Sequence, residues 1–264
     1  MFGMLKGLWE YRSFIVTSIR NEFIARFARS RLGGLWMIIH PLSQVAIYAL
    51  ILSNVLAARL PGIDNKYAYA LYLMAGVLAW NLFSEIVSRC LNIFIEQGNL
   101  MKKMRFPRIA LPVIVLGSCL LNNLLLFVAV LVVFAALGQM PSFEMLWLIP
   151  LTLAVTALAL GLGLVLGVLN VFVRDIGQVV PIILQVWFWF TPIVYSINII
   201  PEDLRSAMAM NPMFGLVSAY HSVLVYQVPP SLDAISITVA ASVGLMLLGL
   251  FMFRRAAPEM VDAL

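Results

Sequence analysis

Long runs of apolar residues alternate with short charged segments along most of this chain. Six of the runs are long enough to cross a bilayer, because a hydrocarbon core about 30 Å thick needs about 20 helical residues. The runs cover residues 35–58, 69–89, 109–137, 146–173, 179–197 and 235–253. The pattern therefore predicts an all-α integral membrane protein whose transmembrane domain, residues 35–253, contains six transmembrane helices.

The charged region before the first run, residues 1–34, is amphipathic. Ile15, Ile19, Phe23 and Phe27 recur at a four-residue spacing, which places them on one face of a helix, although two arginines interrupt that face. A helix of this kind lies in the interface of a membrane on an anionic leaflet. We therefore expect an interfacial helix on the cytoplasmic side of the membrane.

The segment between the fifth and sixth runs, about residues 199–228, does not form a seventh span. Its apolar part, residues 213–226, would reach only about 21 Å as a helix at about 1.5 Å per residue. Residues 201–203 begin a helix with proline and two acids, and residues 211–212 end it with Asn-Pro. We therefore expect a re-entrant helical hairpin on the outer side, which implies a cavity or a partner subunit beside it.

Composition and charge support this arrangement. The chain of 264 residues is 63% hydrophobic and only 11% charged, against about 25% charged in a soluble domain. With the N-terminus inside, all but Arg59, Lys66 and Arg205 of the 17 Lys and Arg residues lie on the cytoplasmic side. A seventh crossing would put the basic tail, residues 254–264, outside, so both termini are expected to be cytoplasmic.

The basic loop after the second run is a candidate contact surface. Residues 94–104 can form a short amphipathic helix that stops before Phe106-Pro107, because a residue before proline avoids the helical region. From the residues alone, two interpretations remain open. The loop either anchors the orientation of the chain or presents a helix that a soluble partner grips.

Polar residues inside the runs have structural interpretations that weigh against their functional ones. Glu85 and Arg89 are one helical turn apart, and pairing between them is favoured over a proton relay. Asn122 and Asn123 suit hydrogen bonds between helices better than a polar route. The run 161–167, Gly-Leu-Gly-Leu-Val-Leu-Gly, lacks the spacing of a dinucleotide loop and favours close helix packing.

Neither a metal site nor ATP chemistry is expected in this chain. The two His residues stand apart, and the two Cys residues, both in or beside apolar runs, lack ligand spacing and predict no disulfide. The dipeptide Gly-Lys does not occur, so the phosphate-cradling loop G-x-x-x-x-G-K-[ST] is missing. A membrane-embedded enzyme acting on a lipid-linked sugar and a scaffold subunit without a pathway remain the alternatives to a transporter.

Aromatic residues are the candidate wall of a pathway. Residues 187–190 are four consecutive aromatics, which point all round a helix, so at least one faces the protein interior. A flat apolar ring facing water suits the C–H faces of sugars. The candidate channel and substrate residues are Tyr48, Trp80, Phe83, Trp187, Phe188, Phe190 and Tyr195.

Three groups of residues, in this order and spacing, carry a family resemblance. They are Arg26, Phe27, Ser30, Leu32, Gly33, Trp36 and Pro41; then Asn99, Leu100, Met101, Lys102, Lys103, Phe106, Pro107, Arg108, Leu111 and Pro112; then Arg174, Asp175, Gln185, Thr191, Pro192, Ile193, Tyr195, Ser196, Pro201, Asn211 and Pro212. Over nearly its whole length the chain resembles the membrane subunit of an ABC-2-type exporter. The branch it resembles moves lipid-linked polysaccharides such as O-antigen, capsule or teichoic acid. His40, Arg105 and Ile109 depart from the family pattern, which affects the expected ATPase contacts and not the architecture.

The resemblance implies a homodimer in the bacterial cytoplasmic (inner) membrane, with a separate soluble ABC ATPase that binds ATP and Mg²⁺. It implies a lipid-linked glycan as substrate, contact with membrane lipids and no nucleic-acid partner; an exporter of a drug or small lipid is the alternative in the same class. The loop after the second span becomes the coupling helix, and the expected ATPase contacts are Phe94, Glu96, Gln97, Leu100, Met101, Lys102, Lys103, Arg105, Phe106 and Arg108. The outer hairpin becomes a gate at the exit of the channel, formed by Pro201, Glu202, Asp203, Asn211 and Pro212.

Overall fold

All regular structure in the described part of the chain is helical. The computed structural model describes residues 7–27, 35–36, 38–40, 42–43, 46–47, 68–103, 106–136, 142–196, 201, 208 and 210–263. The helices are α2 (Arg12–Phe27), α4 (Ala68–Glu96), α5 (Gly98–Lys103), α6 (Ala110–Ala136), the 3₁₀ helix η2 (Phe143–Trp147), α7 (Leu148–Phe172), α8 (Ile176–Trp189), α10 (Pro212–Leu224) and α11 (Leu232–Ala263). Among the described residues, four helices are long and apolar enough to cross a membrane: α4, α6, α7 with η2, and α11.

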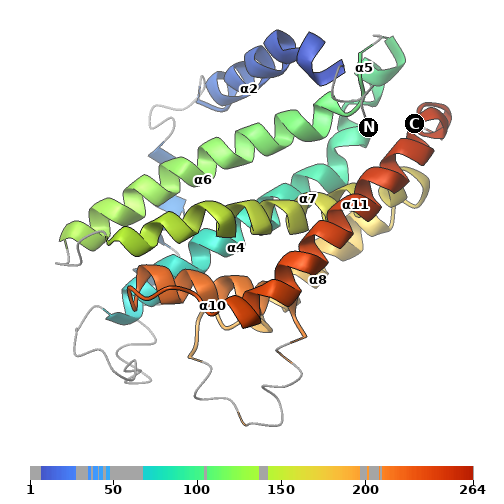
Figure 1. Ribbon diagram of the computed structural model, residues 1–264. Helices are drawn as coiled ribbons and strands as arrows, with labels where there is room; N and C mark the ends of the chain where they lie inside the picture. The colour runs from blue at the N-terminus through green and yellow to red at the C-terminus, as the bar shows by residue number, and fades with distance from the viewer. Residues whose placement is uncertain are drawn as a thin grey trace.

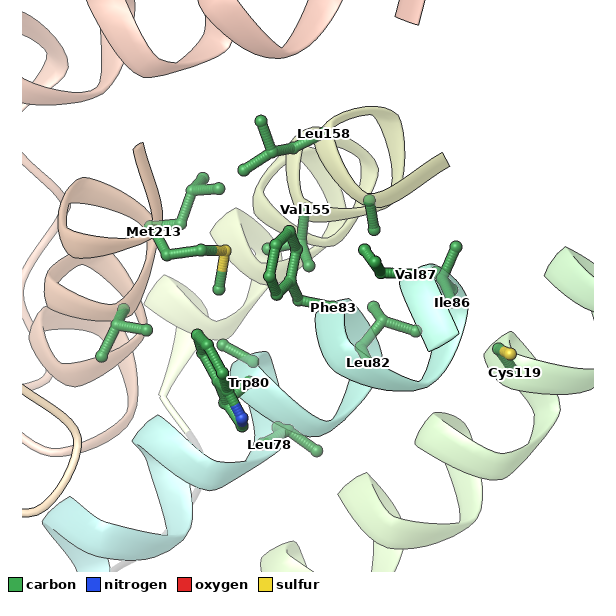
Figure 2. Packing of buried hydrophobic residues seen from close by; sticks show 14 of the residues in the cluster. Leu78, Trp80, Leu82, Phe83, Ile86, Val87, Cys119, Val155, Leu158 and Met213 are labelled. Carbon is green, nitrogen blue, oxygen red and sulfur yellow. The ribbon is translucent and has the colours of Figure 1, made fainter. Parts of the chain in front are cut away.

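Helix α4 is the centre of the bundle. Within its most apolar stretch 78% of the residues are buried, against 33% for α6 and 22% for α11, so α4 is enclosed by protein while the other two expose apolar faces. Figure 2 shows side chains of α4, among them Trp80 and Phe83, facing Val155 of α7 and Met213 of α10. Because lipid is as apolar as a leucine side chain, van der Waals packing of this kind, and not escape from water, holds the helices together.

Helix α7 packs between α4 and α11, and its glycines make that possible. A Cβ on Gly167 would lie 2.3 Å from the carbonyl oxygen of Cys90 in α4. On the opposite side, a Cβ on Gly161 would lie 2.5 Å from the backbone nitrogen of Met246 in α11. The helix backbones therefore touch where these glycines stand, which confirms that the glycine run serves helix packing.

The predicted second, third, fourth and sixth spans are confirmed as helices, with shifted bounds. The helix predicted at 69–89 continues to Glu96, so the short helix that follows is α5 and not the expected 94–104. The last helix continues through the predicted tail to Ala263. The first predicted span, 35–58, lies largely outside the described residues.

The fifth span, predicted at 179–197, is corrected by the structure. Helix α8 begins at Ile176 and ends at Trp189, and 14 residues at about 1.5 Å each reach only about 21 Å. Beyond its end, the backbone carbonyls of Pro192 and Tyr195 each lie 3.2 Å from the hydroxyl of Tyr72 in α4. Side chains of α4 thus replace the hydrogen bonds that a continuing helix would have made within itself.

The second arm of the predicted outer hairpin is present as α10. Asn211 caps this helix, accepting a hydrogen bond of 2.9 Å from the backbone N–H of Met213, and Pro212 occupies its first turn. With 13 residues α10 is too short to span a bilayer, as expected from its length. Most of the first arm lies outside the described residues, so the hairpin as a whole stays a prediction.

The described helices sort to two ends of the molecule (Figure 1). Helices α2 and α5 and the C-terminal end of α11 lie together at one end, and α10 lies toward the other. Contacts between α5 and the last helix agree with this placement.

Candidate functional site

The end of the molecule that carries α5 presents a compact basic surface. A pocket of about 470 Å³ is lined by Tyr11, Met101, Lys102, Lys103, Phe106, Pro107 and Arg108, and we call these residues the basic surface. Met101 is buried while Lys102 and Lys103 are exposed, so the short helix α5 turns its charges outward. Three cations in a mostly polar pocket that also contains Met101 and Phe106 suit an acidic protein surface.

Helix α2 supports this surface from the side. The rings of Phe14 in α2 and Phe106 lie 6.0 Å apart between centroids. Just before α2, a Cβ on Gly7 would lie 3.3 Å from the Cβ of Pro107, so the two segments touch. The sequence-based prediction missed Tyr11, because a contact between residues so far apart in the chain leaves no periodic signal, and it omitted Pro107 between the predicted Phe106 and Arg108.

The expected coupling residues do not all lie on the basic surface. Phe94 is fully buried and stacks on Phe253 of α11 at 5.4 Å, so it serves packing inside the bundle. Glu96 is exposed at the end of α4, Gln97 is half-buried between α4 and α5, and Leu100 is half-buried within α5. Arg105 lies outside the described residues.

Four of the predicted channel aromatics form one cluster, which we call the aromatic cluster: Trp80, Phe83, Trp187 and Phe188. Phe83 and Trp187 meet edge to face with centroids 5.2 Å apart, a favourable geometry for aromatic pairs. Trp80, Phe83 and Phe188 are buried in this single chain, whereas Phe190 is 62% exposed. Of the four consecutive aromatics, two therefore face the interior and two, Trp189 and Phe190, face outward.

Asn211 joins the aromatic helix α8 to α10. Its Oδ1 accepts a hydrogen bond of 2.8 Å from Nε1 of Trp187, in addition to the bond that caps α10. Its Nδ2 donates to Oγ1 of Thr191 at 2.9 Å and to the carbonyl of Phe190 at 3.3 Å. The amide group thus uses both its donor and its acceptor capacity where α8 ends and α10 begins.

Helix α4 holds the opposite side of this junction. The imidazole of His221 in α10 stacks on Tyr72 at 3.6 Å and lies 3.1 Å from the carbonyl of that residue. The hydroxyl of Tyr69 donates to the carbonyl of Val194, and that of half-buried Tyr195 donates to the carbonyl of Trp189 at 2.6 Å. His221 therefore has a structural role in this junction.

The remaining predicted gate and channel residues lie partly outside the described residues. Pro201 is exposed, and Pro212 is half-buried at the start of α10. Tyr48, Glu202 and Asp203 lie outside the described residues. Among the described residues, no group of three or more His, Cys, Asp or Glu side chains is arranged to hold a metal ion.

Comparison with known proteins identifies the family. Residues 14–225 match the model of the family described as "ABC-2 type transporter". The chain is 27% identical over 266 residues to the O-antigen export system permease protein RfbA of Myxococcus xanthus, with 100% of both chains covered. It is 27% identical over 245 residues to the RfbA protein of Klebsiella pneumoniae, with 91% of both covered. The polysialic acid transport protein KpsM of Escherichia coli is 25% identical over 202 residues, or 75% of both chains.

These relatives are transport permeases, and four described helices here are apolar enough to cross a membrane. The family match covers most of the chain and includes the aromatic cluster, the Asn211 junction and every residue of the basic surface except Tyr11. The chain therefore belongs to the ABC-2 type transporter family.

Proposed function

We propose that this chain is the membrane subunit of an ATP-driven exporter that moves a lipid-linked polysaccharide across the bacterial inner membrane. The basic surface carries this proposal. It offers Lys102, Lys103 and Arg108 at one end of the bundle, in a chain whose sequence lacks a phosphate-cradling loop. ATP and Mg²⁺ would bind to a separate soluble ATPase that docks there, and both chain termini would face the cytoplasm.

A glycan substrate is supported by the relatives. Two are named for O-antigen export and one for polysialic acid transport, and the similarity extends over three quarters or more of each chain. Aromatic rings on the outer part of α8 suit the apolar C–H faces of sugar rings. Phe190, directly after α8, is the most exposed of the four consecutive aromatics and the ring best placed to meet a polymer.

The proposed exporter is a homodimer whose channel lies where two copies of α8 meet. The outward face of α8 is about half exposed at Val179, Ile182, Ile183 and Val186. Immediately after it, residues 190–195 form turns, and irregular backbone at membrane depth is tolerated only where it is covered by protein or lines water. Thr191, Ile193 and Val194 are already buried within the chain, so Phe190 is the part of this turn that a second copy or a water-filled channel would cover.

The dimer has a direct test by cross-linking. Ile183→Cys on α8 should form a disulfide between two copies in membranes treated with an oxidant. Val243→Cys on α11 is the control, because Val243 is equally exposed, at 49% against 51%, on a helix expected to face lipid. Equal cross-linking at both positions, or none at Ile183→Cys, would count against the α8 interface.

The transport function is tested with the complex in proteoliposomes. The chain, purified with its ATPase subunit, should move a lipid-linked glycan in an ATP-dependent way, and Leu100→Asp should abolish movement while the bundle stays folded. Transport of a drug or small lipid in place of the glycan would support the alternative substrate class. Turnover of a lipid-linked sugar by the chain alone would support an enzyme.

A further inference from the structure

Arg89 of α4 makes contacts with two other helices. Its Nη2 forms an ion pair with Oε1 of Glu22 in the interfacial helix α2. Its Nη1 lies 3.8 Å from Oε1 of Glu85 one turn earlier in α4. The same nitrogen donates a 3.7 Å hydrogen bond to Sγ of Cys119 in α6. One guanidinium therefore connects α2, α4 and α6.

Helix α6 also donates hydrogen bonds to the carboxylates of Glu22 and Glu85. The hydroxyl of Ser118 donates to Oε2 of Glu22 at 2.8 Å. Nδ2 of Asn122, one turn further along α6, donates to Oε1 of Glu85 at 2.6 Å. Because Ser118 and Asn122 are four residues apart, they share a helix face, as Glu85 and Arg89 do on α4. We call these five residues and Cys119 the Arg89 clasp.

Shape complementarity fixes α2 at the same place. A Cβ on Gly117 of α6 would lie 2.4 Å from Cδ1 of Ile19, so the side chain of Ile19 occupies the space that this glycine leaves. Ile15 is buried with Ala110 and Ile114 of α6. Helix α2 therefore has one register on α6, with the charged contacts of the clasp beside the apolar ones.

The other end of α2 reaches the basic surface. Phe14 packs on Phe106, and Tyr11, directly before the helix, lines the pocket there. From Phe14 to Glu22 the helix rises about 12 Å at about 1.5 Å per residue. A displacement of the basic surface would therefore be passed to α2, a short rigid helix whose far part is held by Arg89.

We propose that Arg89 is a positioning residue that makes α2 and the adjacent parts of α4 and α6 move as one body with the basic surface. The interfacial helix then transmits the movement of the docked ATPase to the spans, in addition to lying on the membrane. A charge-assisted hydrogen bond from Nη2, together with contacts of Nη1 to other residues, gives such a joint both strength and orientation. This inference rests on the proposed function.

Transport stoichiometry tests the transmission. In proteoliposomes with the ATPase subunit, Arg89→Gln and Glu22→Gln should each lower the glycan moved per ATP hydrolysed by roughly tenfold, the ratio that corresponds to one lost charge-assisted hydrogen bond. The double variant should lose less than the sum of the two single effects, because both substitutions remove the same ion pair. Arg89→Lys, which keeps the charge but not the forked geometry, should fall between. The control is Arg20→Gln, an exposed charge on the same helix.

A distance measurement tests the joint without any transport assay. Spin labels on Ile24→Cys in α2 and Leu121→Cys in α6 occupy exposed positions, whereas Cys90 and Cys119 are buried. The distance distribution should be narrow in the otherwise native chain and broad in Arg89→Gln and Glu22→Gln. This measurement stands even if the complex moves no glycan, an outcome that would overturn the proposed function.

The inference fails if the clasp variants behave as Arg20→Gln does. Unchanged glycan per ATP, or a distance distribution as narrow as that of the native chain, would each overturn it. If Arg89→Gln fails to fold, Glu22→Gln decides the question, because it removes one charge and keeps the hydrogen-bonding shape of the side chain.

Discussion

The indole Nε1 of Trp187 donates a 2.8 Å hydrogen bond to Oδ1 of Asn211, and this bond joins the end of α8 to the start of α10. The two residues come from segments that sequence analysis assigned to different parts, an aromatic channel wall and an outer gate. Their contact implies that the hairpin arm and the aromatic helix hold each other in place. A change at one is therefore expected to be felt at the other.

Asn211→Ala should destabilise the chain by about 2–4 kcal/mol, because it removes a helix cap and three further hydrogen bonds. Asn211→Asp should lose about half of that amount, since the carboxylate still accepts from Trp187 and Met213 but no longer donates. The free energy of unfolding in detergent micelles measures both effects. Asn99→Ala, at an exposed position in α5, is the control, and an equal loss there would contradict the role of the junction.

The helical spans were predictable because run length and charge alone decide them. The bounds of the helices around 69–89 and 235–253 were underestimated, since a helix can continue through polar residues beyond its apolar run without those residues entering lipid. The end of α8 was not predictable in this way. The hydroxyls of Tyr69 and Tyr72 donate hydrogen bonds to backbone carbonyls after Trp189. These bonds join residues more than 100 positions apart, so no local sequence pattern predicts them.

At the candidate sites, a partner one helical turn away could be predicted from the sequence, but a partner from another helix could not always be. The pairing of Glu85 with Arg89 was predicted because the two residues are one turn apart, and it is confirmed. The partner that makes the closer contact, Glu22, was missed because it comes from a different helix. Asn122 and Asn123 were predicted to bond between helices, and their amides do so to Glu85 and to the carbonyl of Leu78.

Glycine substitutions in the span helices should have opposite effects at two positions. Gly167→Ala should destabilise the chain by about 1–3 kcal/mol or more, because the new Cβ would meet the backbone of α4 at 2.3 Å, where no side chain can yield. Gly244→Ala in α11 meets nothing within 4 Å and should stabilise by about 0.5–1 kcal/mol through its helix propensity. Unfolding in the same detergent compares the two variants. Equal effects would contradict the close contact between α4 and α7.

Charge reversal on the basic surface should weaken ATPase binding. Lys102→Glu combined with Lys103→Glu is expected to lower the affinity for the ATPase subunit by roughly tenfold and to reduce its dependence on salt, since exposed charges are screened at high ionic strength. Binding measured at low and high salt tests both statements. Arg255→Glu reverses an exposed charge near the end of α11 and should leave the affinity unchanged. Equal weakening by that control would indicate a general charge effect.

Substitutions at Phe190 and Phe83 should distinguish a residue of the pathway from a residue of the packing that supports it. Phe190 is 62% exposed, so Phe190→Ala should change the free energy of unfolding by less than about 0.5 kcal/mol and still reduce polymer export several-fold by removing an aromatic platform.

Phe83 has no exposed surface and packs against Trp187, so Phe83→Ala should cost about 3–5 kcal/mol of stability whatever its effect on export. Export per folded complex, measured beside thermal unfolding, distinguishes the two roles. Full export by Phe190→Ala would remove this ring from the channel, and a stable Phe83→Ala would remove the aromatic cluster from the core. After either result, the next ring to test is Trp189, the other exposed member of the four consecutive aromatics. Trp189 is 53% exposed, and its backbone carbonyl accepts a hydrogen bond from the hydroxyl of Tyr195.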